Sequence, residues 1–221
     1  MSYSRDERRA LCTLLDEAGP EAPTLCEGWT TLDLAAHLVL REHRPDAAAG
    51  MLGGPLGWYT AHVQHRLAER TPYARLVKTV RDGPPLLSVF GIPGVDERAN
   101  LVEYFVHHED VRRAAPGWRA RDLDQGLTEQ LWVRLRMTRL ILRKVPVGLE
   151  FARDDVGNGE HENGAGRQLR MTVRTGTPVV TVVGSPAELT LWAVGRTTVA
   201  RVRMDGTEQA VRALTEASWR L

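Results

Sequence analysis

The spacing of apolar residues along this chain changes near residue 145, and this change limits the folds that the chain can adopt. Before that point apolar side chains recur every three or four residues, as Leu11, Leu14 and Leu15 do, which is the spacing of an amphipathic helix. After it they alternate with other residues, as Leu149 and Phe151 do, which is the spacing of a half-buried strand. The sequence therefore predicts an α+β protein in which a helical part precedes a mixed part.

We place the boundary at residues 144 and 145, so that a helical bundle covers residues 1–144 and a small α+β domain covers residues 145–221. A chain of 221 residues is long enough for two such domains. In the first part we expect helices over residues 5–18, 30–43, 58–69, 96–114 and 124–143, and a shorter helix that opens at Thr71-Pro72. In the second part we expect strands over residues 147–151, 169–173, 179–183 and 197–204, helices over 186–195 and around 210–214, and a flexible connection over 157–166.

The charges of the chain nearly cancel, since 29 Lys and Arg residues face 28 Asp and Glu residues for a net charge of +1. Nucleic-acid-binding proteins usually carry a basic excess, so we expect no nucleic-acid partner. No apolar run is long enough to cross a bilayer, and the polar N-terminal segment lacks the apolar stretch of a signal peptide. We therefore expect a cytoplasmic protein with no membrane partner, whose oligomeric state the sequence leaves open.

A polar stripe within an apolar pattern distinguishes one of the expected helices. Glu103 and His107 are four residues apart on one helix face, and Asp110 follows three residues later on the same stripe. Val106 and Val111 flank the stripe, so it should face the interior, where unpaired charge is costly. A bound divalent metal ion would compensate that cost.

Another residue that could bind metal, His37, lies in the apolar run 34–40, LAAHLVL. A single histidine in such a run is usually a core residue bonded to a backbone carbonyl. Combined with Glu103 and His107, however, it would supply three ligands from two antiparallel helices and leave one coordination position open, as in catalytic zinc sites. Asp110 would then accept a hydrogen bond from a ligand imidazole and orient it.

A second interpretation of the same residues needs no metal. Glu103 and Asp110 would form an ion-pair network with Arg112 and Arg113, and spacing alone does not separate the two interpretations. The ligand types also suit several divalent ions, of which zinc is one.

The remaining histidines are not expected to bind metal. His108 projects about a quarter-turn or more from the His107 face, so we expect it at the surface, paired with Arg112 or Glu109. Solvated positions are expected for His43, His62, His65 and His161.

Two cysteines are present. Cys12 falls in an apolar helix pattern and is expected in the core. Cys26 precedes a Glu-Gly-Trp turn, and a redox role for it stays open. In the absence of a secretion signal we expect free thiols.

The segments that carry these residues resemble signatures of the mycothiol-dependent maleylpyruvate isomerase superfamily. Residues 25–38, LCEGWTTLDLAAHL, are similar to its first signature, and residues 100–113, NLVEYFVHHEDVRR, are similar to its second. Residues 184–196, GSPAELTLWAVGR, are similar to part of its second domain. Within the superfamily the chain looks like an actinobacterial subgroup described only as metal-binding.

This resemblance implies a fold and a set of site residues. The fold is a DinB-like four-helix bundle followed by an α+β domain related to sterol-carrier-like folds. The implied metal ligands are His37, Glu103 and His107. Arg196 is implied as a residue that holds a substrate carboxylate, and Arg41 is added on geometry alone, because it lies one turn after His37.

The activity that the resemblance implies is thiol chemistry at a divalent metal ion, with zinc as the expected ion. Such an ion favours the thiolate of a low-molecular-weight thiol, mycothiol in this superfamily, for attack on a small electrophile in a transferase or isomerase reaction. Two alternatives stay open: a hydrolase with metal-activated water, and a metal- or ligand-binding module without turnover. The sequence does not identify the electrophile.

Overall fold

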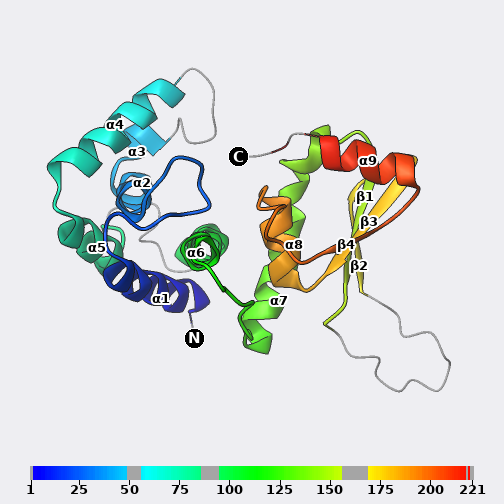
Figure 1. Cartoon of the computed structure of the whole chain (residues 1–221), viewed down its shortest axis with the longest axis horizontal. Helices are drawn as coiled ribbons and strands as arrows, with labels where there is room; N and C mark the ends of the chain where they lie inside the picture. The colour runs from blue at the N-terminus through cyan, green and yellow to red at the C-terminus, as the bar shows by residue number, and fades with distance from the viewer. Residues whose placement is uncertain (1, 49–55, 86–94, 156–168, 218, 220–221) are drawn as a thin grey trace. The chain divides into compact units, whose positions relative to one another are not determined.

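The computed structural model describes residues 2–48, 56–85, 95–155, 169–217 and 219. The protein belongs to the α+β class (Figure 1). Its chain divides into two compact units, Met1–Ala120 and Arg121–Leu221, each with its own apolar core. The connection expected over residues 157–166 lies outside the described residues. Among the helices that the structure describes, none is both long and apolar enough to cross a membrane.

The first unit is helical. Its helices are α1 (Tyr3–Ala18), α2 (Thr31–His43), α3 (Pro45–Ala48), α4 (Gly57–Arg70), α5 (Tyr73–Asp82) and α6 (Val95–Ala114). α1 lies along α5 and α6, and α2 packs against α4 and α5 (Figure 1). The helices expected over residues 5–18, 30–43, 58–69 and 96–114 are confirmed to within two residues at each end.

Local sequence signals explain where several of these helices begin and end. Gly19 follows α1 with a φ of 75°, a conformation that glycine adopts at little cost. At the start of α2 the Thr30 N–H donates to the Asp33 carboxylate at 3.0 Å, which is half of a capping box. The short helix expected to open at Thr71-Pro72 is α5, which begins at Tyr73 with Pro72 as its N-cap residue.

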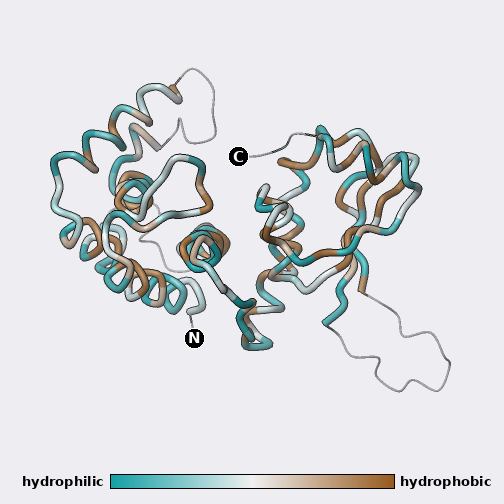
Figure 2. Tube along the Cα trace, viewed as in Figure 1, coloured by the Kyte–Doolittle hydropathy of each residue, from teal (hydrophilic) through white to brown (hydrophobic). Residues whose placement is uncertain are grey.

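The core of the first unit is an apolar layer between α1, α2, α5 and α6. Leu11, Leu34 and Val77 are fully buried in it, and Tyr104 joins it from α6; Figure 2 shows apolar stretches on each of these helices. α6 also buries a long series of polar side chains: Asn100, His107, His108, Glu109, Asp110 and Arg113. Each of these polar groups needs a partner inside the protein.

The second unit is built on one sheet. Its strands are β1 (Gly148–Arg153), β2 (Arg170–Arg174), β3 (Val179–Gly184) and β4 (Arg203–Asp205), in the spatial order β2-β1-β3-β4. β1 runs parallel to β3, whereas the β1–β2 and β3–β4 pairs are antiparallel. Its helices are α7 (Gln125–Arg134), α8 (Pro186–Ala193) and α9 (Glu208–Glu216), and the 3₁₀ helices η3 (Leu135–Arg139) and η4 (Leu142–Lys144) follow α7. The rings of Phe151, Trp192 and Trp219 pack in its core, Phe151 edge-to-face with Trp192 at 5.9 Å and Trp219 tilted against Trp192 at 4.9 Å between centroids.

The helix expected over residues 124–143 is shorter than predicted. α7 ends at Arg134, and 3₁₀ turns replace its last part. In η3 the Thr138 hydroxyl donates to the Leu135 carbonyl at 2.6 Å, a local bond of the kind that competes with the helical ladder.

The division between the units also differs from the one expected at residues 144 and 145. The second unit begins at Arg121, because the segment after α7 contributes Leu135 and Leu142 to the core around the sheet. Helical periodicity alone had grouped α7 with the preceding helices.

The strand expected over residues 197–204 is confined to β4. Before it, Ala200 N–H donates to the Arg196 carbonyl at 3.0 Å in a turn, and Arg201 N–H donates to the Glu188 carboxylate of α8 at 2.8 Å. The alternation of Ala200 and Val202 therefore reflects packing against the core rather than strand pairing.

Candidate metal centre

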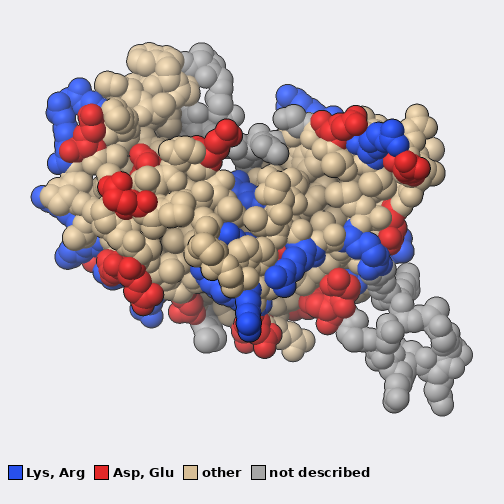
Figure 3. Space-filling model, viewed as in Figure 1, with Lys and Arg blue, Asp and Glu red and all other residues tan. Residues whose placement is uncertain are grey.

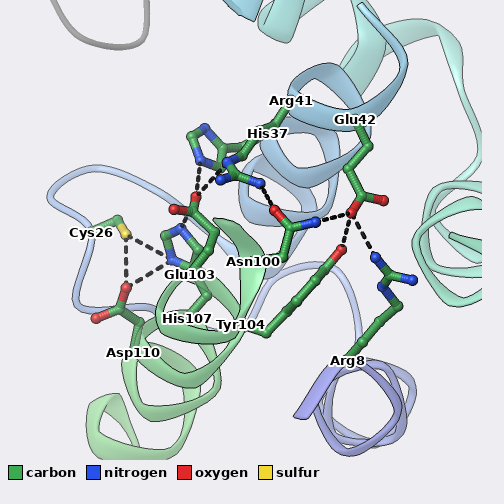
Figure 4. A network of polar contacts seen from close by, with 10 residues as sticks. All are labelled: Arg8, Cys26, His37, Arg41, Glu42, Asn100, Glu103, Tyr104, His107 and Asp110. Atoms are coloured by element: carbon green, nitrogen blue, oxygen red, sulfur yellow. Dashed lines mark hydrogen bonds and ion pairs between the residues drawn. The ribbon is translucent and has the colours of Figure 1, made fainter. Parts of the chain in front are cut away.

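Three side chains with metal-ligating atoms meet between two helices of the first unit (Figure 4). His37 extends from α2, and Glu103 and His107 extend from α6. Glu103 Oε1 lies 3.3 Å from His37 Nε2 and 3.2 Å from His107 Nε2. One ligand atom of each residue lies within 4.8 Å of the other two. The structure thus brings together the three residues that the sequence singled out.

The spacing of these atoms fits a four-coordinate cation. Nitrogen and oxygen ligands with bonds of about 2.0–2.1 Å to zinc lie about 3.3–3.4 Å apart at the corners of a tetrahedron. Both contacts of Glu103 are close to that value. Because only three side chains supply these atoms, a cation held by them would keep a position for water or substrate.

The three side chains combine rigid placement with access to solvent. The exposed fraction is 9% for the His107 side chain and 13% for that of His37, whereas it reaches 26% for Glu103. Trp29 lies against His37 with ring centroids 4.9 Å apart. The imidazoles are therefore held by packing while the carboxylate side remains partly open.

Two of the three groups already have the protonation state that a metal ion needs, whereas His107 holds a proton that the ion would displace. Burial lowers the pKa of His37, against the opposing effect of its hydrogen bond with Glu103, so this ring is neutral near pH 7. Burial also acts to lower the pKa of His107, but hydrogen bonds with Asp110, Cys26 and Glu103 outweigh it and hold that pKa well above its usual value. Burial acts to raise the pKa of Glu103, but hydrogen bonds from His107 and His37 keep it well below its usual value. A positive charge is therefore favoured beside Glu103.

The other ring nitrogen of His107 faces a second pair of side chains. Asp110 Oδ2 lies 2.9 Å from His107 Nδ1, and Cys26 Sγ lies 3.3 Å from that oxygen and 4.0 Å from Nδ1. Leu25 N–H donates to the Asp110 backbone carbonyl at 3.1 Å, which ties the loop before α2 to α6. The sequence alone did not place Cys26 in this cluster, because no local spacing links a loop residue to a distant helix. The signal available was its position at the start of the segment that leads to His37.

A buried polar network continues from Glu103 into the helical core (Figure 4). Arg41 Nε lies 3.5 Å from Glu103 Oε1, and Arg41 Nη1 donates to Asn100 Oδ1. Asn100 is fully buried and donates through its amide nitrogen to Glu42 Oε1 at 3.3 Å. The position of Glu103 is thus linked to a second, deeper carboxylate.

Glu42 of α2 accepts hydrogen bonds from donors on two other helices, α1 and α6. Its Oε1 accepts from Arg8 Nη2 of α1 at 2.8 Å, from the Tyr104 hydroxyl of α6 and from Asn100. The Arg8 guanidinium also lies over the Tyr104 ring, 4.8 Å from its centroid. A buried carboxylate without such partners costs several kcal/mol, so this network favours one arrangement of α1, α2 and α6.

The prediction that His108 lies at the surface was wrong. It is buried, and its Nδ1 lies 2.9 Å from the Glu7 carboxylate of α1, because α1 covers this face of α6. Arg112 and Arg113, which were expected beside the other acidic residues of α6, bind Glu109 at 3.0 and 2.5 Å.

The remaining residues named from the sequence lie away from this cluster or outside the described chain. His62 and His65 are exposed on α4 and His43 is half-buried, while His161 lies outside the described residues. Cys12 is buried and free, as expected.

Arg196 belongs to the second unit. It follows α8, and its Nη1 donates to the Val194 carbonyl at 3.0 Å. Its role toward a substrate, like that of Arg41, stays a prediction.

No protein-family model, curated protein or solved structure matches this chain. The resemblance to the maleylpyruvate isomerase superfamily therefore remains a prediction that depends on the quoted sequence segments. What the geometry contributes independently is a partly buried cluster of two imidazoles and one carboxylate with spacing suited to a metal ion.

Proposed function

We propose that the protein is a divalent-metal-dependent, mycothiol-using thiol transferase or isomerase that acts on a small electrophile. The observation that carries this proposal is the convergence of His37, Glu103 and His107, whose ligand atoms lie within 4.8 Å of one another. The proposal includes the finer fold assignment, in which the first unit is a DinB-like bundle and the second is related to sterol-carrier-like domains.

Each residue of the cluster has a defined task in this proposal. His37, Glu103 and His107 hold the ion, most simply zinc, and Asp110 orients His107 through its Nδ1 hydrogen bond. The ion supplies a positive charge that lowers the pKa of a bound thiol and so favours the nucleophilic thiolate.

The arginines named from the sequence are proposed to bind anionic groups. Arg41 already contacts Glu103, and its side chain keeps an exposed fraction of 16%, so it borders the open side of the cluster. Arg196 is proposed to hold a carboxylate of the substrate. We propose a cytoplasmic location, which is consistent with the lack of a disulfide between Cys12 and Cys26.

Native mass spectrometry with and without mycothiol, combined with a thiol-consumption assay, tests the proposal. We expect one metal ion per chain, a further mass increase of one thiol when mycothiol is added, and thiol loss in the presence of a suitable electrophile. A His65→Ala variant serves as the control, because His65 is exposed on α4.

Three results would contradict the proposal. Absence of bound metal after loading with zinc would remove its basis. One bound ion with neither thiol binding nor thiol consumption would favour a metal-binding module, and hydrolysis of an ester or amide by the loaded protein would favour the hydrolase alternative.

A further inference from the structure

The imidazole of His107 has a metal-ligating environment at both of its nitrogens (Figure 4). Nε2 faces Glu103 at 3.2 Å, and Nδ1 faces Asp110 at 2.9 Å. Beyond Nδ1, Cys26 Sγ completes a second set of three ligand atoms that lie within 4.8 Å of one another. The proposed function uses the Nε2 side and leaves this thiol unexplained.

We propose that Cys26, His107 and Asp110 form an alternative binding position for one strongly thiophilic metal ion such as Cd²⁺. A thiolate, an imidazole and a carboxylate make a softer ligand set than the two imidazoles and carboxylate on the other side. The position goes beyond the proposed function. It shares His107 with the proposed centre but requires neither His37 nor a thiol cosubstrate.

The distances suit such an ion with small adjustments. For bonds of about 2.3 Å to sulfur and about 2.0–2.1 Å to nitrogen and oxygen, tetrahedral ligands lie about 3.6 Å apart for the sulfur pairs and about 3.3 Å apart for the nitrogen–oxygen pair. The corresponding separations are 3.3 Å for Cys26–Asp110, 4.0 Å for Cys26–His107 and 2.9 Å for His107–Asp110. Small side-chain shifts would bring each pair to its expected separation.

The surroundings hold these three groups in place. Asp110 is fully buried and His107 nearly so. The loop that carries Cys26 is tied to α6 by the bond between Leu25 N–H and the Asp110 carbonyl at 3.1 Å. Within that loop, Cys26 N–H donates to the Thr24 hydroxyl oxygen at 3.2 Å. Because of these bonds, the thiol already faces the buried carboxylate.

An ion at this position would change which carboxylate accepts the remaining proton of the His107 imidazole, from Asp110 to Glu103. When an ion binds at Nδ1, the neutral imidazole carries its proton on Nε2, and Glu103 lies at 3.2 Å to accept it. The thiol proton of Cys26 and the proton that the charged imidazole holds on Nδ1 both pass to solvent as the ion binds. When an ion binds at Nε2, the Nδ1 proton is instead accepted by Asp110.

A neutral imidazole offers only one unprotonated nitrogen, so the two positions exclude each other. The chain would therefore bind one ion at a time and would sort ions by softness. Harder ions would take the position with His37, and thiophilic ions would take the position with Cys26.

Titration with Cd²⁺, followed by the near-ultraviolet absorption of thiolate-to-metal charge transfer, tests this inference. We expect the band to saturate at one equivalent in the wild type and to persist in His37→Ala. We expect it to be lost in Cys26→Ser, together with a decrease of Cd²⁺ affinity of about 10- to 100-fold. Cys12→Ala is the matched control, because Cys12 is buried on α1 outside the cluster, and it should retain the band.

The outcome separates this inference from the proposed function. A folded His37→Ala variant that binds Cd²⁺ without the band, or wild type with two equivalents bound, would overturn the alternative position. If His37→Ala does not fold, X-ray absorption of Cd²⁺-loaded wild type decides, since the inference requires one sulfur ligand. If His37→Ala loses Mn²⁺ binding and neither wild type nor any variant shows a thiolate band with Cd²⁺, the inference is rejected. The proposed function is then left intact.

Discussion

At the scale of single residues, His107 connects the two clusters of the site. One ring nitrogen contacts Glu103 and the other contacts Asp110, at 3.2 and 2.9 Å. Its neighbour in the sequence, His108, binds Glu7 of α1 instead. Adjacent histidines on one helix point to different surroundings, so helix geometry alone assigns them different roles.

Asn100 is the residue whose loss should affect both the stability and the metal site, because it joins Arg41 to Glu42. Asn100→Ala removes one donor from buried Glu42 and one acceptor from Arg41. We expect a loss of about 1–3 kcal/mol in the free energy of unfolding and metal affinity about tenfold lower. Denaturant unfolding and metal titration measure the two effects.

A second substitution at the same position controls for the side-chain volume. Asn100→Asp keeps the shape but places a carboxylate beside Glu42, so its loss of stability should exceed that of Asn100→Ala. If both variants stay within about 0.5 kcal/mol of wild type, the network does not support the site.

Cys12 gives a pH-dependent contribution to stability. Burial raises the pKa of Cys12 to about 11 from a usual value of 9.0, with nearby Arg81 and Arg8 acting in the opposite direction. A raised folded-state pKa means that the contribution is fully present below pH 9 and is lost as pH rises through about 11. The rise of this pKa from 9.0 to about 11 corresponds to about 2–3 kcal/mol in the free energy of unfolding.

Wild type should therefore lose stability relative to Cys12→Ala as pH rises from 9 through about 11. Denaturant unfolding of both proteins at a series of pH values measures the difference in the free energy of unfolding. A difference that stays constant across this range would contradict the assigned burial of the thiol.

At the scale of helices and strands, the close approach of β1 to the turn before β3 offers a sharp test of the second unit. A Cβ at Gly148 would collide with the Gly176 backbone carbonyl, which cannot move without disturbing the sheet. We expect Gly148→Ala to lower the free energy of unfolding by about 1–3 kcal/mol. Gly184→Ala is the control, because its nearest contact is a Val202 side-chain atom at 3.2 Å. An equal or larger loss in Gly184→Ala would contradict the packing described.

Elements with a long, uninterrupted periodic pattern could be predicted from the sequence. α1, α2, α4 and α6 and the first three strands agree closely with expectation, because their burial follows their own periodicity. α7 and β4 do not, since the Thr138 hydroxyl bond and the Glu188 bond to Arg201 are interactions that no period reveals.

The same reasoning applies to the site. His37, Glu103 and His107 were identified because helix spacing and an apolar context mark them. Cys26 and Asn100 were not, since their roles depend on how a loop and two helices meet in space. Sequence patterns thus indicate residues that act along one element, and structure is needed for those that act between elements.

At the scale of the whole molecule, metal binding should stabilise one unit and not the other. The cluster lies entirely within Met1–Ala120, whereas Arg121–Leu221 has its own core. The surface of the protein carries interspersed charges of both signs in the view of Figure 3, consistent with the net charge of +1.

We therefore predict that loading with Mn²⁺ raises the melting temperature of the first unit, seen as one of the calorimetric transitions. A chelator should reverse this rise. An ion at 100 times its dissociation constant stabilises the folded unit by about 2.7 kcal/mol. The transition of the second unit should not move, and His37→Ala should show no shift. If the melting temperatures of all transitions rise equally, the ion does not bind at the cluster of the first unit.

The central claim is that α2 and α6 together hold one cation, and metal analysis of variants loaded with Mn²⁺ tests it most directly. This ion has little preference for thiolate, so it reports on the His37, Glu103 and His107 cluster alone. We predict about one ion per chain in wild type and in the exposed-site control His65→Ala, and a value near background in folded His37→Ala and in folded His107→Ala. Full occupancy in either of the last two variants would contradict the account.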